Sequence, residues 1–160
     1  MFVAGIDLST FAVDVVKVPL DQGPPQWHRF PLTGSDAFER ARSVRDAMPG
    51  SSSVFWDDVL AVGIEEPAGR NPGVIFRVQG AVLARIPTHL LVEKLMPSQW
   101  RRLVGLPGNA SKADVRSHAT LNGVGRLNDG TFVWPQDACD AWCIALATRA
   151  LITTPKEKAA

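Results

Sequence analysis

The chain has 160 residues, of which 46% are hydrophobic and 21% charged, with a formal net charge of +1. These values are typical of one soluble globular domain with its own hydrophobic core. Asp7 interrupts the first apolar run, and no apolar stretch of about 18 residues occurs, which excludes a secretory signal segment and a membrane-spanning helix. We therefore expect a soluble, cytoplasmic protein.

Short strands are predicted in the first fifth of the chain. Residues 2–8 and 11–18 are apolar or β-branched runs of strand length, and residues 26–30 form a third run after Gly23-Pro24-Pro25. Their short connections favour an antiparallel meander.

Helices and two further strands follow, and together they predict an α/β fold with one mixed sheet of five strands and helices on both faces. Residues 59–64 and 89–92 are the expected strands. Residues 1–152 are expected to form the domain, with a polar tail over 153–160. The predicted helices are 35–48 with Ser35 as N-cap, 72–84, 97–103, 111–121 with a Ser111/Asp114 capping box, and 135–152, with a loop over 122–134.

Positive charge is concentrated in the middle of the chain. Residues 70–126 hold nine basic and two acidic residues, a net charge of +7, whereas the remainder has a net charge of −6. A basic surface beside an acidic site would give this split, and so would a chance distribution of solvated charges. The nine residues are Arg70, Arg77, Arg85, Lys94, Arg101, Arg102, Lys112, Arg116 and Arg126.

The two cysteines are predicted to be core residues in a reducing compartment. Cys139 and Cys143 lie four residues apart in a predicted helix, where they are poorly placed to form a disulfide with each other. The histidines at 28, 89 and 118 are scattered and give no zinc-binding spacing.

Four carboxylates stand where buried strands end or the last helix begins. Asp7 ends the first strand, Glu65 follows the strand 59–64, and Asp137 and Asp140 share one face of the last helix. Such positions can converge on one site, whose oxygen-only ligands would suit Mg²⁺ or Mn²⁺. The site would fit two-metal phosphodiester hydrolysis, in which one ion activates water and the other stabilises the leaving oxygen.

Each carboxylate also has a purely structural interpretation. Asp7 could begin a turn, and Asp137 could interact with the helix dipole. Glu66, next to Glu65, would point to the opposite face of the strand and is the poorer ligand.

Five segments, in order along residues 2–150, resemble the RuvC-type Holliday-junction resolvases of the ribonuclease H-like superfamily, which includes bacteriophage-encoded members. A phage-encoded chain would work in the cytoplasm of the host. The combination is specific, although each segment alone is weak. The segments are Ala4-Gly5-Ile6-Asp7-Leu8-Ser9-Thr10, Gly63-Ile64-Glu65-Glu66, Asn71 with Val78-Gln79-Gly80-Ala81, 104–115 with Ala110-Ser111-Lys112, and Asp137-Ala138-Cys139-Asp140-Ala141 with the apolar residues that follow.

The resemblance implies a metal-dependent endonuclease that cleaves Holliday junctions or other branched DNA, including flaps and forks. It implies two Mg²⁺ or Mn²⁺ ions per active site, bound by Asp7, Glu65, Asp137 and Asp140 as catalytic residues.

Basic residues of the resembling segments are expected at the DNA. Lys112 corresponds to a lysine near the scissile phosphate, where it would stabilise developing charge; alternatively it merely occupies the first turn of a helix, where the dipole opposes a cation. Trp100 could stack on DNA, although core packing is the simpler account. The predicted DNA-binding residues are Arg70, Arg77, Arg101, Arg102, Lys112 and Arg116.

The sequence departs from the family in one segment. Family members often carry an aromatic residue two or three positions after the second acidic motif, proposed to wedge into the junction. Pro67 and Ala68 stand there instead, and Phe76 is an alternative wedge. The departure concerns junction selectivity and cleavage-sequence preference more than the nuclease chemistry.

We also expect a homodimer built around the helix 72–84. A four-way junction offers two symmetry-related strands, and a two-fold dimer presents two matching sites. The helix has an apolar stripe of Val74, Val78, Ala81 and Val82, which packing against its own sheet would explain equally well.

Three other functions fit parts of the pattern. An ATP-binding domain of the actin and sugar-kinase type also starts with Gly-Ile-Asp, but it needs a longer chain and a second glycine-rich phosphate loop. A ribonuclease H-like domain could bind branched DNA without cutting it. A nuclease of the same fold could instead act on flaps or RNA/DNA hybrids.

Overall fold

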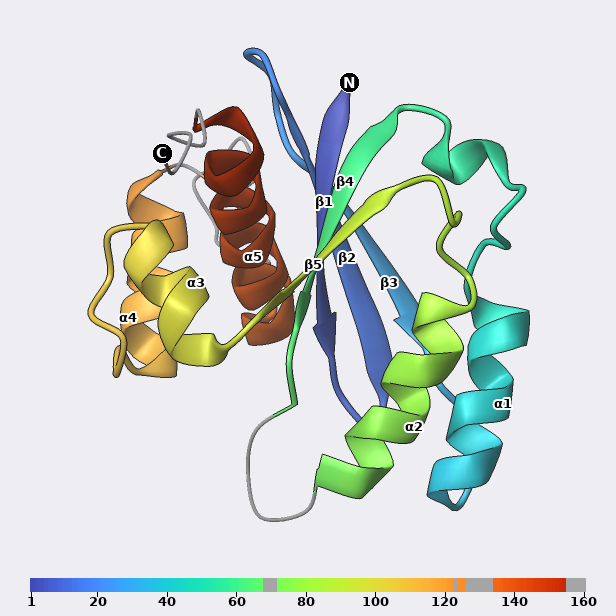
Figure 1. Cartoon of the computed structure of the whole chain (residues 1–160). Coiled ribbons are helices and arrows are strands. Elements are labelled where there is room, and N and C mark those ends of the chain that lie inside the picture. Colours follow the sequence, from blue (N-terminus) through green and yellow to red (C-terminus); the bar gives the residue numbers. More distant parts are fainter. Residues whose placement is uncertain (68–71, 123, 126–133, 155–160) are drawn as a thin grey trace, which may run out of the picture.

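A five-stranded sheet separates two groups of helices in the computed structural model, which describes residues 1–67, 72–122, 124–125 and 134–154 (Figure 1). The strand order is β3-β2-β1-β4-β5. The first three strands pair antiparallel, and β4 is parallel to both β1 and β5, which confirms the predicted mixed sheet. The strands are β1 (Phe2–Leu8), β2 (Ala12–Pro19), β3 (Gln26–Pro31), β4 (Val59–Glu65) and β5 (Leu91–Leu95).

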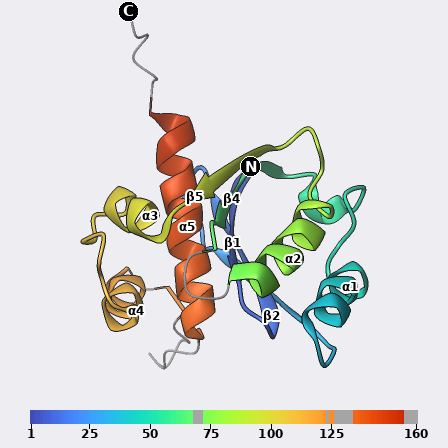
Figure 2. The same cartoon turned by 60° about the horizontal axis from the view of Figure 1, so that its bottom comes forward.

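Helices cover both faces of this sheet, as predicted (Figures 1 and 2). Two of them lie on one face, where Val44 and Val78 join an apolar cluster with β1, β2 and β4. The other three lie on the opposite face, and the longest of these packs directly on β1, β2 and β4. The first pair is α1 (Ala37–Ala47) and α2 (Pro72–Leu83), and the second group is α3 (Pro97–Leu103), α4 (Lys112–Leu121) and α5 (Gln136–Thr153).

Helix α5 lies unusually close to the sheet because two strands carry glycine beneath it. A Cβ atom on Gly5 of β1 would overlap the backbone of Ala141 and Ala145, and one on Gly63 of β4 would overlap the Thr148 hydroxyl. Gly5 and Gly63 are paired across the two parallel strands. The two glycines therefore together leave the space that the helix backbone occupies. The strand propensities of the sequence did not predict this role.

Several element boundaries differ from the predicted ones. Helix α1 uses Asp36 as its N-cap, because that carboxylate accepts hydrogen bonds from two backbone amides, whereas Ser35 bonds to Glu39. Strand β5 runs over Leu91–Leu95 and not 89–92, because an edge strand tolerates polar residues such as Glu93. A short 3₁₀ helix, η1 (Val54–Trp56), was not predicted.

The predicted capping box and the predicted burial of the two cysteines are confirmed. Ser111 and Asp114 form the capping box of α4. Cys139 and Cys143 are free and buried, and burial, with a contribution from Asp140, raises the pKa of Cys139 to about 11. No helix in the described ranges is long and apolar enough to span a membrane. Most of the loop 122–134 and of the tail 153–160 lies outside the described residues.

Candidate active site

Two acidic strand ends lie side by side in the middle of the sheet. Ile6 of β1 pairs with Ile64 of β4 in parallel register, so Asp7 and Glu65 follow at the same level of their strands. Side chains alternate between the faces of a strand, which places both carboxylates on the same face as Gly5 and Gly63. Asp7 and Glu65 therefore lie on the face that α5 covers.

Helix α5 brings two further carboxylates to these strand ends. Its residues Ala141 and Ala145 lie over Gly5, and Asp137 and Asp140 occupy the preceding turn, toward the helix N-terminus. Asp140 is buried, whereas the Asp137 side chain retains 27% of its exposure. The two glycines thus allow α5 to lie close enough to the sheet for Asp137 and Asp140 to reach the strand ends.

The four predicted carboxylates interact electrostatically. Burial raises the pKa of Asp7 well above its usual range, and the charges of Asp140, Glu65 and Asp137 raise it further. Burial also raises the pKa values of Glu65 and Asp140. Carboxylates that disfavour one another's ionisation form a site that gains from a bound cation.

Neighbouring side chains make polar contacts with three of these carboxylates. The indole Nε1 of Trp100 donates to Glu65 Oε2 at 2.7 Å, and Gln136 Nε2 donates to Asp140 Oδ1 at 2.9 Å. Arg29 lies 3.8 Å from Asp137. Trp100 is fully buried, which supports the core-packing interpretation of this residue and adds a contact to Glu65 that the sequence did not reveal.

The donor chemistry of the site fits divalent cations, because four carboxylates supply the hard oxygen ligands that Mg²⁺ and Mn²⁺ prefer. Within the described residues, however, no three Asp, Glu, His or Cys side chains already stand together as a ready-made metal site. Trp100, Gln136 and Arg29 each contact one of the four carboxylates.

Two of the predicted basic residues act on the acidic cluster. The positive charges of Lys112 and Arg101 oppose the raised pKa values of both Glu65 and Asp140. Lys112 is the first residue of α4 and is exposed. The Arg101 guanidinium stacks 4.8 Å from the centre of the Trp100 ring.

The other predicted DNA-binding residues are Arg70, Arg77, Arg102 and Arg116. Arg77 on α2 and Arg102 on α3 are exposed. Arg116 on α4 donates to the carbonyl of Trp134 at 3.3 Å, and its charge partly opposes the raised pKa of Cys139, so it lies beside the start of α5. Arg70 falls outside the described residues.

Asp14 and Gln79 were not predicted as part of the site. Asp14 lies opposite Asp7 on β2, is fully buried, and contributes to the raised pKa of Asp7. A carboxylate inside the apolar run of β2 was a signal in the sequence, because such a group needs a partner when buried. The buried Gln79 side chain donates to the Glu65 carbonyl at 3.0 Å, which ties α2 to the end of β4.

The mixed five-stranded sheet with helices on both faces has a ribonuclease H-like fold of the RuvC type. The RuvC structure of Thermus thermophilus superposes with a TM-score of 0.67 at 21% identity, covering 95% of each chain. The same protein in complex with a Holliday junction substrate gives 0.68 at 20% identity, covering 95% of this chain and 94% of that one.

A Fowlpox virus resolvase in complex with Holliday junction DNA has a TM-score of 0.56 at 11% identity, covering 96% of this chain and all of the resolvase chain. The sequence itself matches no protein-family model and no curated protein. The resemblance read from the sequence is therefore confirmed at the level of the fold.

Proposed function

We propose that the chain is a metal-dependent, structure-selective endonuclease that cleaves Holliday junctions or related branched DNA. The observation that carries this proposal is the convergence of Glu65, Asp137 and Asp140 on Asp7, whose pKa their charges raise, in a RuvC-type fold. One RuvC structure and the poxvirus resolvase structure each contain Holliday junction DNA, which supports branched DNA as the substrate class.

Each part of the site has a role in this proposal. The four carboxylates would hold two divalent cations, which would supply the Lewis-acid chemistry of phosphodiester hydrolysis. Trp100 and Gln136 orient Glu65 and Asp140 through hydrogen bonds from outside the ligand set. Lys112, at the exposed start of α4, places a positive charge where the scissile phosphate would enter.

The proposal is tested with a panel of labelled four-way junctions, flaps, forks, RNA/DNA hybrids and linear duplexes, each incubated with Mg²⁺ or Mn²⁺. We expect incision of branched DNA that a chelator abolishes. Asp7→Asn should abolish cleavage while leaving junction binding largely intact, because binding depends on the basic residues.

The matched control for Asp7→Asn is Asp46→Asn. Asp46 is an exposed carboxylate of α1, on the opposite face of the sheet, and pairs with the exposed Arg45. Cleavage by the Asp46 variant should equal that of the unmodified protein. Retained cleavage by Asp7→Asn would show that the active site lies elsewhere, and exclusive cleavage of RNA/DNA hybrids would replace the proposed substrate.

We further propose that the working unit is a homodimer formed through the outer face of α2. The predicted apolar stripe does not itself support this, because Val78 and Val82 are fully buried against their own sheet. The support comes from the opposite side of the helix, where Phe76 is 45% exposed and Gly80 has open space beside it. Two copies could approach closely there.

Analytical sedimentation with junction cleavage tests the dimer. Phe76→Asp should shift the protein toward a monomer and impair paired incision, whereas Phe38→Asp changes an exposed phenylalanine of α1 and should leave the oligomeric state unchanged. A clean monomer of 17.3 kDa with full junction-cleaving activity would exclude the dimer.

A further inference from the structure

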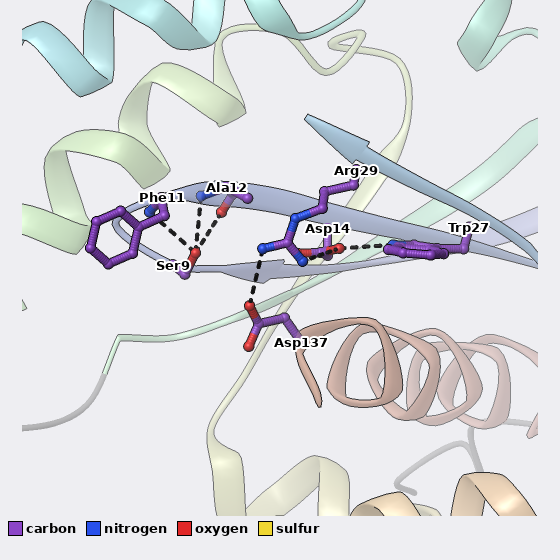
Figure 3. A network of polar contacts seen from close by, with 7 residues as sticks. All are labelled: Ser9, Phe11, Ala12, Asp14, Trp27, Arg29 and Asp137. Atoms are coloured by element: carbon purple, nitrogen blue, oxygen red, sulfur yellow. Dashed lines mark hydrogen bonds and ion pairs between the residues drawn. The ribbon is translucent and has the colours of Figure 1, made fainter. Parts of the chain in front are cut away.

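Asp14 and Arg29 extend the acidic site sideways across the sheet. Asp7 of β1 lies opposite Asp14 of β2, and Asp14 lies opposite Arg29 of β3. Opposed residues of antiparallel strands share a face, so these three side chains form a row beneath the start of α5. Figure 3 shows the Arg29 side chain lying between Asp14 and Asp137.

Asp14 is a carboxyl group held in the interior. Its side chain is 1% exposed, and its Oδ1 accepts hydrogen bonds from Trp27 Nε1 at 2.8 Å and Arg29 Nη1 at 3.3 Å. Its Oδ2 lies 3.1 Å from Arg29 Nη1 but makes no aligned hydrogen bond within the described residues. A buried carboxylate directly opposite Asp7 is costly without a counter-ion, and Arg29 is that counter-ion.

The second arm of Arg29 makes a looser contact. Its Nη2 lies 3.8 Å from Oδ2 of Asp137, which is ion-pair distance but beyond a hydrogen bond. The Asp137 side chain is 27% exposed, compared with 1% for Asp14. The contact with Asp14 is therefore the fixed one, and the contact with Asp137 is the one that another cation can replace.

We propose that Arg29, anchored on Asp14, is a positioning residue that balances the charge of Asp137 until a divalent cation takes over that role. This inference rests on the proposed function, because the cation is the one that the nuclease site would bind. Cation binding then requires Arg29 to release Asp137 while it stays paired with Asp14. The pair Asp14–Arg29 thus lowers the affinity of the site for the divalent cation.

The experiment is a calorimetric titration of the full chain with Mn²⁺, without DNA and at low ionic strength. Arg29→Gln should bind Mn²⁺ about fivefold more tightly, because a competing positive charge is removed. Arg45→Gln removes the same charge from an exposed position on α1 and should leave Mn²⁺ affinity unchanged. A merely structural role for Arg29 would not tighten binding.

Arg29→Gln leaves the buried Asp14 without its counter-ion and could destabilise the fold. The same substitution is therefore also tested in the Asp14→Asn variant, where no buried charge is left behind. Asp14→Asn should weaken Mn²⁺ binding, because Arg29 then pairs with Asp137 alone. Adding Arg29→Gln to Asp14→Asn removes both charges together and should restore tighter binding, again by about fivefold relative to Asp14→Asn. Thermal unfolding of each variant verifies that it is folded.

The outcomes separate this inference from the proposed function. Unchanged or weaker Mn²⁺ binding on removal of Arg29, in either background, would overturn the role assigned to Arg29 and leave the nuclease proposal standing. Failure of the unmodified protein to bind Mn²⁺ at all would overturn both.

Discussion

The two faces of the sheet differ in the kind of residue that they bury. On the face covered by α1 and α2, strand and helix residues such as Ile6, Val13 and Val78 form an apolar cluster. On the face covered by α5, the same strands carry glycines in their middle and the carboxylates Asp7 and Glu65 at their ends. The first face gains stability from burial, whereas the second gives up part of that gain to hold charges together.

This difference shows why the acidic face needs the close approach of α5. Without side chains on Gly5 and Gly63, the helix backbone lies directly on the strands, and its N-terminal turn reaches the strand ends. A larger separation would leave Asp137 and Asp140 away from Asp7. The glycines therefore set the geometry of the site as well as the packing of the core.

The largest effect is expected from Gly5→Ala. The added methyl would overlap the backbone of Ala141 and Ala145, which cannot move without displacing α5, so we expect a loss of about 3 kcal/mol or more in the free energy of unfolding. Leu121→Ala is the control, because it truncates an 85% exposed side chain at the end of α4 and should change the free energy of unfolding by less than about 0.5 kcal/mol. Urea unfolding compares the two; equal stabilities would refute the close approach of α5.

A second prediction contrasts two buried tryptophans, one on each face. Trp100→Phe removes the hydrogen bond to Glu65, and we expect about a 10- to 100-fold loss of cleavage activity. Trp56 lies in the apolar cluster, and its buried Nε1 has no hydrogen-bond partner in the described part of the chain. Trp56→Phe should therefore change cleavage little, and similar losses in both variants would mean that Trp100 acts through packing alone.

The third prediction concerns stability and pH in the metal-free protein. The pKa values of Asp7, Glu65 and Asp140 are raised in the folded state, so folding takes up protons. The free energy of unfolding should therefore be greatest at pH values in the ordinary carboxyl range, and it should decrease as pH rises through the raised pKa values. Thermal unfolding with a chelator at pH 5 and pH 7.5 measures this dependence.

Asp7→Asn should flatten that dependence and raise the unfolding temperature at pH 7.5, by about 2–4 °C for each kcal/mol recovered. The exposed Asp46→Asn variant should do neither. An unfolding temperature that is lower at pH 5 than at pH 7.5 in the unmodified protein, as paired surface carboxylates would cause, would contradict an acidic cluster whose charges destabilise the metal-free fold.

The smallest effect is expected on DNA affinity. Lys112→Gln should weaken junction binding only a few fold and reduce the dependence of log affinity on log salt by about one unit, as loss of one phosphate contact requires. Arg45→Gln, on the α1 face, should leave that slope unchanged. Fluorescence anisotropy over a range of salt concentrations checks both, and an unchanged slope for Lys112→Gln would exclude a phosphate contact.

The sequence by itself determined most of the elements and the four carboxylates. Strand and helix periodicity are local properties, and acidic residues that end buried strands or share a helix face are visible from spacing alone. Asp7, Glu65, Asp137 and Asp140 were identified in this way, as was the capping box at Ser111. Boundaries that depend on neighbours, such as those of β5, were less accurate.

Only the tertiary structure decided what surrounds those carboxylates. Trp100 meets Glu65 across 35 positions of sequence, and Arg29 reaches Asp137 from a strand at the far edge of the sheet. The need for glycine at Gly5 and Gly63 arises from the approach of a helix that begins more than 70 residues after either strand. Such contacts depend on strand order and helix packing, which no local pattern in the chain encodes.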